Sequence, residues 1–326
     1  MSDTGTTGSA PTGTGPTGVD PTDVDPTGTA PTGSAPTGVA PTGIRLSGIG
    51  DEAAPGLDRQ IEAVRRLGWD SVELRSVDGV PLADLDGPAF DRVAGQLADA
   101  GLGVSCVDSR IGNWARTVVS PFADDLTELD RLADRCDRLG TRLVRIMSYP
   151  NAGLPDADWE REVLDRTRRL AARAEDAGLV LVHENCAGWA ATDPARMLRL
   201  LDAADSPALR LLFDVGNGIA YGYEAYDLLA DIAPYVAHVH VKDGTGDTSA
   251  QYYSLPGDGN CRVADSLRVL FARGYSGVVS IEPHINIRPH EGWSDPSGDY
   301  VDEFVAYGQR LEKLLGELDH PAVTRP

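Results

Sequence analysis

Short apolar runs alternate with longer amphipathic segments along most of this chain, from Ile44 to Leu318. Runs of about four to eight mostly apolar residues, bounded by turn residues, are typical of buried strands. By this criterion the sequence predicts eight strands, at 44–49, 71–77, 103–109, 142–148, 179–185, 209–215, 236–242 and 277–283.

Helical patterns lie between the strands, at 57–68, 90–101, 126–140 and 163–178, and each of these ends on a glycine suited to a left-handed cap. Three more helices are expected after the later strands, and 300–318 follows the eighth. Eight strands alternating with eight helices over about 275 residues predict an α/β fold, a (β/α)8 TIM barrel. A doubly wound open sheet is the main alternative, but the first turn, "GIGDEAAPG", lacks the spacing of its phosphate-binding glycines.

The N-terminal segment has a different pattern, in which proline recurs every five residues and is followed by threonine and usually glycine. Such a segment has little apolar surface to bury and is expected to be disordered. The sequence therefore predicts three parts: a disordered low-complexity tail at 1–43, a barrel at 44–318 and a short C-terminal tail at 319–326. For the N-terminal segment we favour a tail without a binding role over a segment that binds a partner.

Composition and charge restrict the partners of this chain. Of its 326 residues 41% are hydrophobic, and 50 acidic against 29 basic residues give a net charge of -21. A charge of this sign disfavours nucleic acid and anionic membranes. We therefore expect a small, neutral or metal-neutralised substrate, no nucleic acid and no membrane.

The four cysteines are far apart and contain no C-x-x-C pair, which argues against a zinc knuckle or a disulfide framework. The N-terminus lacks a signal-peptide pattern, and no apolar run approaches the length of a membrane span. We expect a cytoplasmic protein with reduced thiols.

Four ionisable side chains stand at the carboxyl ends of four successive predicted strands: Glu184, Asp214, His240 and Glu282. The carboxyl ends of barrel strands carry the active site, and the alternation of side chains turns all four inward. Three carboxylates beside one imidazole repel one another unless a cation lies between them, which predicts a divalent metal rather than four solvated strand ends. This ligand set suits Mn²⁺, Co²⁺, Mg²⁺ or Zn²⁺, and its carboxylate majority favours Mn²⁺.

The motifs "HENCAGW", "FDVGN", "HVHVKD" and "SIEPH", in this order, resemble the strand ends of the xylose isomerase-like TIM-barrel superfamily, especially sugar phosphate isomerases/epimerases. The segment "GLDRQIEAVRRLGWDSVELR" is similar to that family's first helix and second strand. The resemblance implies that Glu184, Asp214, His240 and Glu282 bind one divalent ion, and that Glu184 and Glu282 form an acid/base pair. It implies isomerisation or epimerisation of a sugar, by proton abstraction next to a carbonyl and through a metal-stabilised enediolate.

His183 precedes Glu184 and has two interpretations. On a regular strand it points outward towards the helices and is a hydrogen-bonded histidine of the second layer. If the strand has already ended, it reaches the substrate as a second base.

Other polar and aromatic residues near the predicted mouth are candidate substrate contacts. Asn217 stands where many members of the family have a histidine, and Trp189 and Trp114 are candidates for an apolar wall. On the earlier strands, Glu73, Arg75, Asp108 and Arg110 are further candidates for sugar contacts, although salt bridges within the barrel are the favoured interpretation for them. His238 is expected to be a buried, hydrogen-bonded imidazole. The residues that we expect to bind the substrate are Asn217, Lys242, His284, Trp189 and Arg145. Two long segments, 243–261 and 284–299, are expected to act as lids or partner surfaces.

Three other functions remain open at this point. A lyase similar to C-glycoside deglycosidase catalytic subunits would cleave an oxidised (3-oxo) glycoside, would use His183 as base, and would work with a small β-sheet partner subunit. "ENCAG" also resembles an endonuclease IV strand end, but no histidine precedes His183 and the acidic charge opposes DNA. A non-catalytic binding protein would not need the intact four-residue set. A homo-oligomer is compatible with each of these functions.

Overall fold

The computed structural model describes residues 43–288, 293–294 and 298–318. The predicted N-terminal tail at 1–43, except Gly43, and the predicted C-terminal tail at 319–326 lie outside the described residues, as does part of the predicted lid at 284–299.

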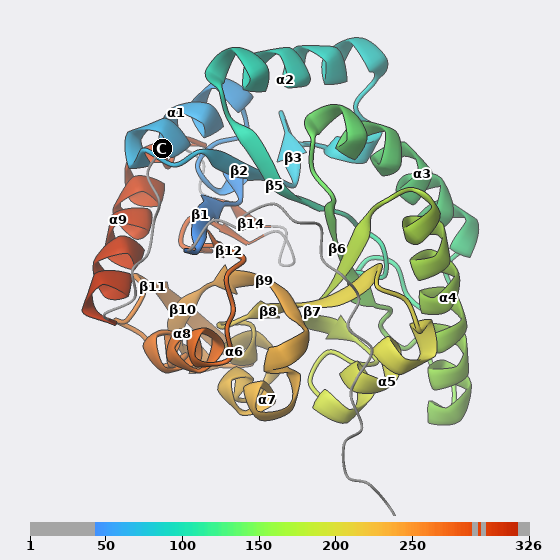
Figure 1. Ribbon diagram of the computed structural model, residues 1–326. Coiled ribbons are helices and arrows are strands. Elements are labelled where there is room, and N and C mark those ends of the chain that lie inside the picture. Colours follow the sequence, from blue (N-terminus) through green and yellow to red (C-terminus); the bar gives the residue numbers. More distant parts are fainter. Residues whose placement is uncertain (1–42, 289–292, 295–297, 319–326) are drawn as a thin grey trace, which may run out of the picture. The chain divides into compact units, whose positions relative to one another are not determined.

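Eight parallel strands form the barrel of a (β/α)8 fold, and helices surround it (Figure 1). Their order in the sheet is β1-β12-β9-β8-β7-β6-β5-β2, so each strand lies beside its neighbour among the eight along the chain. All eight strands predicted from the apolar runs are present, with ends that differ by up to three residues. They are β1 (Arg45–Gly48), β2 (Ser71–Leu74), β5 (Gly103–Asp108), β6 (Leu143–Ser148), β7 (Val180–Gly188), β8 (Leu209–Asp214), β9 (Val236–Val241) and β12 (Val278–Ile281).

The barrel is nearly closed between its first two strands. There β1 and β2 share a single parallel bridge, which joins Ile49 to Glu73. The Ser47 hydroxyl lies 3.2 Å from the Ser71 carbonyl oxygen and 2.8 Å from the Ser105 hydroxyl. Side-chain hydrogen bonds thus supplement a short backbone ladder at this seam.

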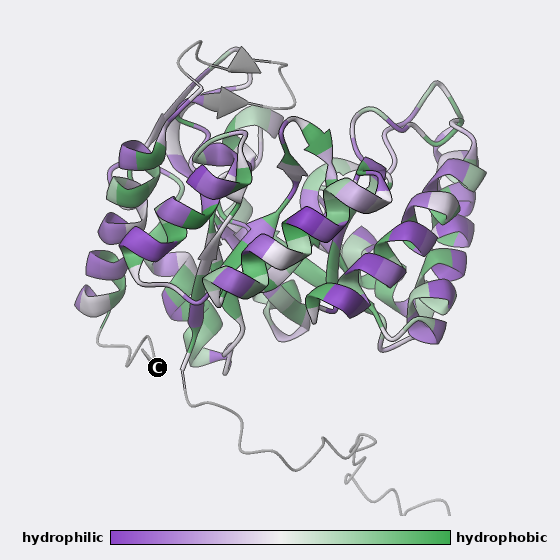
Figure 2. Cartoon of the chain, turned by 90° about the horizontal axis from the view of Figure 1, so that it is seen from above, coloured by the Kyte–Doolittle hydropathy of each residue, from purple (hydrophilic) through white to green (hydrophobic). Residues whose placement is uncertain are grey.

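Hydrophobic and hydrophilic residues alternate along the helices (Figure 2), and the buried positions of the helices are mostly hydrophobic. This arrangement follows from apolar residues at helical spacing. Gly68, Gly101 and Gly140 cap their helices in the left-handed conformation, as expected, whereas Gly178 lies one residue beyond its cap. The helices are α1 (Leu57–Leu67), α2 (Gly87–Ala100), α3 (Phe122–Leu139), α4 (Asp156–Asp176), α5 (Pro194–Ala204), α6 (Gly218–Tyr221), α7 (Ala225–Ile232), α8 (Val263–Ala272) and α9 (Val301–Glu317).

A small apolar cluster fills part of the barrel interior, separate from the main core between strands and helices. It consists of Cys106, Val182 and Leu212, with Leu143, Val180 and Ala237 packed against it. Val180 and Val182 precede Glu184, and Leu212 precedes Asp214, at two-residue spacing, so strand alternation turns them to the same side as these two acids. Glu184 and Asp214, two positions further along the same strands, therefore reach the carboxyl-terminal end of the interior.

The loops between the barrel strands and the helices contain short strands and single-turn helices. They are the strands β3 (Ser76–Val77), β4 (Val80–Pro81), β10 (Asp243–Asp247), β11 (Ala250–Ser254), β13 (Ile287–Arg288) and β14 (Trp293–Ser294), and the 3-10 turns Gly50–Glu52, Leu82–Asp84 and Ala233–Tyr235.

The long segment after β9 is an ordered hairpin and loop rather than a structureless lid. Strands β10 and β11 pair in antiparallel fashion, and the buried Asp243 side chain organises the return of the chain. Its carboxylate accepts hydrogen bonds from the backbone N–H groups of Gly244, Gly257, Gly259 and Cys261, at 2.7 to 3.1 Å. Gly259 lies so close that an added Cβ would meet Asp243 Oδ1 at 2.3 Å.

All four cysteines lie in the described part of the chain, where they are buried and free. Among the described residues, no helix combines the length and apolar content needed to cross a bilayer.

Candidate active site

Four side chains converge at the carboxyl ends of neighbouring strands. Glu184 lies on β7, Asp214 ends β8, His240 lies on β9, and Glu282 follows β12 directly. Asp214 and His240 are register partners, and all four side chains are buried. One ligand atom from each lies within 4.8 Å of those from the other three. The structure thus brings together the four residues that the sequence analysis selected as metal ligands.

His240 shows how well this group fits a cation. Its Nδ1 atom lies 3.2 Å from Glu282 Oε2, 3.8 Å from Glu184 Oε1 and 3.9 Å from Asp214 Oδ2. Among the residues that the structure describes, this buried nitrogen has no hydrogen-bond partner. Metal bonds of about 2.0–2.2 Å keep ligand atoms within roughly 4.4 Å of one another, so a small contraction would suffice to surround one ion. These buried acidic and imidazole groups could therefore bind a divalent metal.

Lys242 and Asn217 connect the carboxylates on the β8–β9 side. Lys242 Nζ lies 3.1 Å from Asp214 Oδ2 and 3.0 Å from Glu282 Oε2, and it donates to Asn217 Oδ1 at 2.9 Å. The Asn217 amide in turn donates to Glu184 Oε1, also at 2.9 Å. Lys242 and Asn217, two of the predicted substrate contacts, thus lie against the four candidate ligands and hold their carboxylate oxygens in place.

Arg145 enters the site from β6. Its Nη1 atom lies 3.1 Å from Glu184 Oε2, and its Nε atom lies 3.4 Å from Asp108 Oδ1. The Arg145 guanidinium is therefore already paired with two buried carboxylates, which restricts its orientation towards a substrate.

Arg75, which follows β2, plays the corresponding part on the opposite side of the site. Its guanidinium lies 2.8 Å from Asp51, 3.2 Å from Glu52 and 3.4 Å from Glu282. Of the two acid/base candidates, Glu184 is thus paired with Arg145 and Glu282 with Arg75.

These neighbours separate the pKa values of the carboxyl groups. Burial acts to raise the pKa of Glu184, but the charge of Arg145 and the hydrogen bond and charge of His240 together outweigh it and lower that pKa to about 2. Burial raises the pKa of Asp214 to about 7, although Lys242 partly offsets this increase. For Glu282, Lys242 and His284 outweigh burial and hold the pKa well below its usual range. Glu184 and Glu282 are thus the carboxyl groups that the site keeps ionised.

His284, a predicted substrate contact, lies beside Glu282 and is fixed by Glu52. Glu52 accepts from the backbone N–H of His284 at 2.7 Å, and its other oxygen lies 2.9 Å from His284 Nδ1. The backbone of His284 is left-handed, with φ of 53°, a conformation that costs free energy for a residue with a Cβ. The Tyr253 ring packs edge-on against the imidazole, with centroids 5.3 Å apart.

His183 and Trp189 lie away from these groups. The backbone of His183 is in register with Ile146 and Leu211, and its buried ring points to the outer side of the strand. Neither ring nitrogen of His183 has a hydrogen-bond partner within the described part of the chain, and burial lowers its pKa to about 4. Trp189 belongs to the main hydrophobic core, where Arg196 covers its ring at 5.1 Å.

The opening above the ligand group is narrow and has one apolar wall. Cys186 and Trp114 form this wall, and both belong to a small apolar cluster with Met147, Ala187 and Tyr221. The cavity between them measures about 10 Å³, room for roughly one water molecule. Its lining comprises Arg75, Trp114, Arg145, Glu184, Cys186, Asn217, Lys242, Glu282 and His284.

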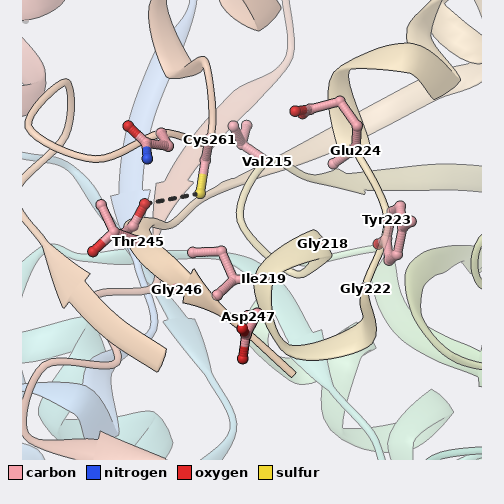
Figure 3. A pocket seen from close by; sticks show the side chains of 13 residues that line it. Val215, Gly218, Ile219, Gly222, Tyr223, Glu224, Thr245, Gly246, Asp247 and Cys261 are labelled. Carbon is pink, nitrogen blue, oxygen red and sulfur yellow. Dashed lines mark hydrogen bonds between the residues drawn. The ribbon is translucent and has the colours of Figure 1, made fainter. Parts of the chain in front are cut away.

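A larger cavity, of about 370 Å³, lies on the far side of the loop after β8 (Figure 3). Residues around α6 form one side of it, and β10 forms the other. Cys261 Sγ lies there, 3.7 Å from the Gly244 carbonyl oxygen. The described residues that line this cavity include none of the predicted site residues.

The sequence analysis missed Asp51 and Glu52. They lie three and four residues after the end of β1, at the same end of the barrel as the other site residues, so the rule used for the later strands applies to them as well. Their presence in a loop that lacks phosphate-binding glycines is the signal that selects them.

Comparisons with known proteins agree with this architecture. A family model described as "Xylose isomerase-like TIM barrel" matches residues 61–302. A crystal structure of the IOLI protein with a zinc atom superposes with a TM-score of 0.64 over 84% of this chain and 98% of that one, at 16% identity, which shows the shared fold.

Two curated relatives are similar in sequence. A 2-epi-5-epi-valiolone 7-phosphate 2-epimerase of Actinoplanes sp. is 33% identical over 135 residues, which cover 41% of this chain and 48% of the relative. An inosose dehydratase of Geobacillus kaustophilus is 26% identical over 169 residues, which cover 47% and 54%. The chain thus spans about half the length of the curated relatives it matches.

Proposed function

The chain belongs to the xylose isomerase-like TIM barrel family, and we propose that it is a divalent-metal-dependent isomerase or epimerase of a keto-sugar or keto-cyclitol. The reaction begins with removal of the proton next to the substrate carbonyl. The similarity to an epimerase and to inosose dehydratases supports this class of substrate, because both names denote enzymes that act on cyclic polyols or their oxidised forms.

The observation that carries the proposal is that His240 Nδ1, which makes no hydrogen bond among the described residues, faces three carboxylates from three other strands. A buried polar atom without a partner costs free energy, and buried like charges repel one another. Glu184, Asp214, His240 and Glu282 would hold the metal, with Mn²⁺ favoured by the oxygen-rich set and Co²⁺, Mg²⁺ or Zn²⁺ also compatible. When bound, a divalent ion polarises a carbonyl and stabilises the negative charge that develops on its oxygen.

Glu184 and Glu282 are the acid/base pair of the proposed reaction. Arg145 holds Glu184, and Arg75 and Lys242 hold Glu282, so that each carboxylate is ionised and fixed in orientation. One glutamate takes the proton from carbon, and the electron pair of the broken C–H bond moves towards the carbonyl oxygen. Return of a proton to the neighbouring carbon, together with transfer of the hydroxyl proton between the two oxygens, gives the isomer, whereas return to the original carbon by the opposite glutamate, on the other face, gives the epimer.

The charges around the cavity favour a substrate without phosphate. Each described cationic side chain that lines the cavity already faces at least two buried carboxylates within 4 Å. A phosphate group would have to compete with these carboxylates for Arg75, Arg145 or Lys242. Hydroxyl groups, in contrast, can hydrogen-bond to the same groups without displacing them.

A lyase is the second candidate, and the position of Lys242 favours it. After the same proton abstraction, the C–O bond at the next carbon breaks and its electron pair leaves with the oxygen. The Lys242 ammonium, whose pKa the acids Asp214 and Glu282 raise well above its usual range despite burial, would give that oxygen a proton. Dehydration of a keto-cyclitol and cleavage of a 3-oxo-glycoside are two forms of this reaction, and the similarity to inosose dehydratases supports the first.

The experiment that tests the proposal follows deuterium in D₂O. The Mn²⁺-loaded protein is incubated with an inosose, a ketohexose and a 3-oxo-glycoside, and the products are analysed by NMR and mass spectrometry. Deuterium in recovered or epimerised substrate indicates an isomerase or epimerase, whereas loss of water or of the aglycone indicates the lyase. Glu282→Gln is the matched control and should abolish both signals. Absence of exchange and of elimination with all three compounds would contradict proton abstraction as the activity.

A further inference from the structure

Glu73 lies wholly buried inside the barrel, beneath the proposed metal centre and outside the lining of the substrate cavity. It comes from β2, crosses the interior and meets two imidazoles of β9. Its Oε2 atom lies 2.8 Å from His238 Nε2, and its Oε1 atom lies 3.0 Å from His240 Nε2. The carboxylate thus uses one oxygen for each ring.

This bridge determines which nitrogen of His240 carries hydrogen. A carboxylate accepts hydrogen bonds and does not donate them, so each imidazole must present an N–H from Nε2. In its neutral form His240 then carries its lone pair on Nδ1, the atom that faces Glu184, Asp214 and Glu282. A metal requires that lone pair, since a protonated nitrogen cannot be a ligand.

His238 explains why Glu73 itself cannot turn away. Because one oxygen of the Glu73 carboxylate bonds to His238, the carboxylate cannot rotate, and its other oxygen stays directed at His240. The two rings lie nearly perpendicular, with centroids 5.3 Å apart. The apolar residues Cys106, Val182 and Leu212 fill the interior nearby, so little water is present to compete for these hydrogen bonds.

We propose that Glu73 is a positioning residue that fixes the Nε2–H tautomer of His240 and thereby makes Nδ1 the metal ligand, with His238 holding the Glu73 carboxylate in place. The metal part of this inference rests on the proposed function, whereas the tautomer is a property of the chain alone. Residues that orient metal-binding histidines in this way typically change metal affinity by roughly 10- to 100-fold when they are replaced.

The test begins with the tautomer in metal-free, ¹⁵N-histidine-labelled wild-type protein. The chain has six histidines, so a long-range ¹H–¹⁵N spectrum can be assigned with single substitutions. We expect hydrogen on Nε2 of both His238 and His240. A wild-type His240 that carries no hydrogen on Nε2 would overturn the inference without any variant of Glu73, so the test does not depend on how such a variant folds.

The second measurement uses Glu73→Met, which removes both acceptors and keeps the side-chain length. We expect His240 to move hydrogen to Nδ1, where it can donate to Glu282, and calorimetry to show Mn²⁺ affinity lower by roughly 10- to 100-fold. Asp108→Leu is the control, because it removes another buried carboxylate whose oxygens accept no hydrogen bond within the described residues. It should preserve the His240 tautomer and reduce Mn²⁺ affinity much less.

The outcomes separate this inference from the proposed function. A Glu73→Met protein with wild-type tautomer and affinity would overturn the positioning role, as would an equal loss of affinity in Asp108→Leu, which would indicate a general charge effect. A wild-type protein that shows the expected tautomer but binds no Mn²⁺ would contradict the proposed metal site, while the assignment of the Glu73–His240 hydrogen bond would remain supported.

Discussion

The ammonium nitrogen of Lys242 lies 3.1 Å from Asp214 Oδ2, so a positive charge of the chain itself already sits against the proposed metal ligands. We predict that Lys242→Met destabilises the metal-free protein by about 3–5 kcal/mol, because buried carboxylates lose their partner. The same change should leave Mn²⁺ affinity equal or higher, since a competing cation is gone, and should lower kcat by roughly 10²- to 10⁴-fold if Lys242 donates a proton.

Chemical unfolding with and without Mn²⁺, calorimetry and steady-state kinetics measure these three effects. Weaker Mn²⁺ binding by Lys242→Met would contradict the role of Lys242 as a competing charge.

His183 should act on stability rather than on catalysis. Its pKa is lowered from 6.5 to about 4 by burial, so protons bind to the unfolded chain first as the pH falls. Its contribution to stability is therefore complete above pH 6.5 and declines between pH 6.5 and 4, by about 3 kcal/mol in total. His183→Leu, similar in volume, should retain kcat and remove this part of the acid sensitivity.

Urea unfolding of wild type and His183→Leu at pH 8, 6 and 4.5 measures the difference. A loss of turnover in His183→Leu of the size seen for Glu282→Gln would instead identify His183 as the base and favour the lyase.

The two tryptophans of the predicted wall should behave differently. Trp114→Ala removes a half-buried side chain from the cavity lining and should raise KM with little change in stability. Trp189→Ala opens the main core and should cost about 3–5 kcal/mol, with KM unchanged where the protein stays folded. A KM effect confined to Trp189→Ala would show that the described cavity is not the substrate site.

The regular features of this fold follow from local patterns. Each strand is an apolar run between turn residues, and the alternation of side chains placed Glu184, Asp214, His240 and Glu282 on one side of the sheet. The closing of a parallel sheet into a barrel then brings four strand ends together, whatever the detailed packing.

Contacts across the barrel could not be predicted in the same way. Glu73 of β2 meets His240 of β9, and Arg75, after β2, meets Glu282, after β12, because of the tilt and stagger of strands that are not neighbours. Strand alternation indicates that Glu73 points inward but not how far it reaches. Likewise, Trp189 follows the Glu184 motif closely in sequence, yet the turn after β7 directs its ring into the core.

The central claim is that one divalent ion binds between Glu184, Asp214, His240 and Glu282. The most direct measurement is elemental analysis and Mn²⁺ titration after chelation, for wild type and for the Glu184→Gln/Asp214→Asn double variant. We predict about one ion per wild-type chain and loss of binding in the variant, because two of the four ligands lose their charge. Equal metal content in both proteins would contradict the assignment of the site.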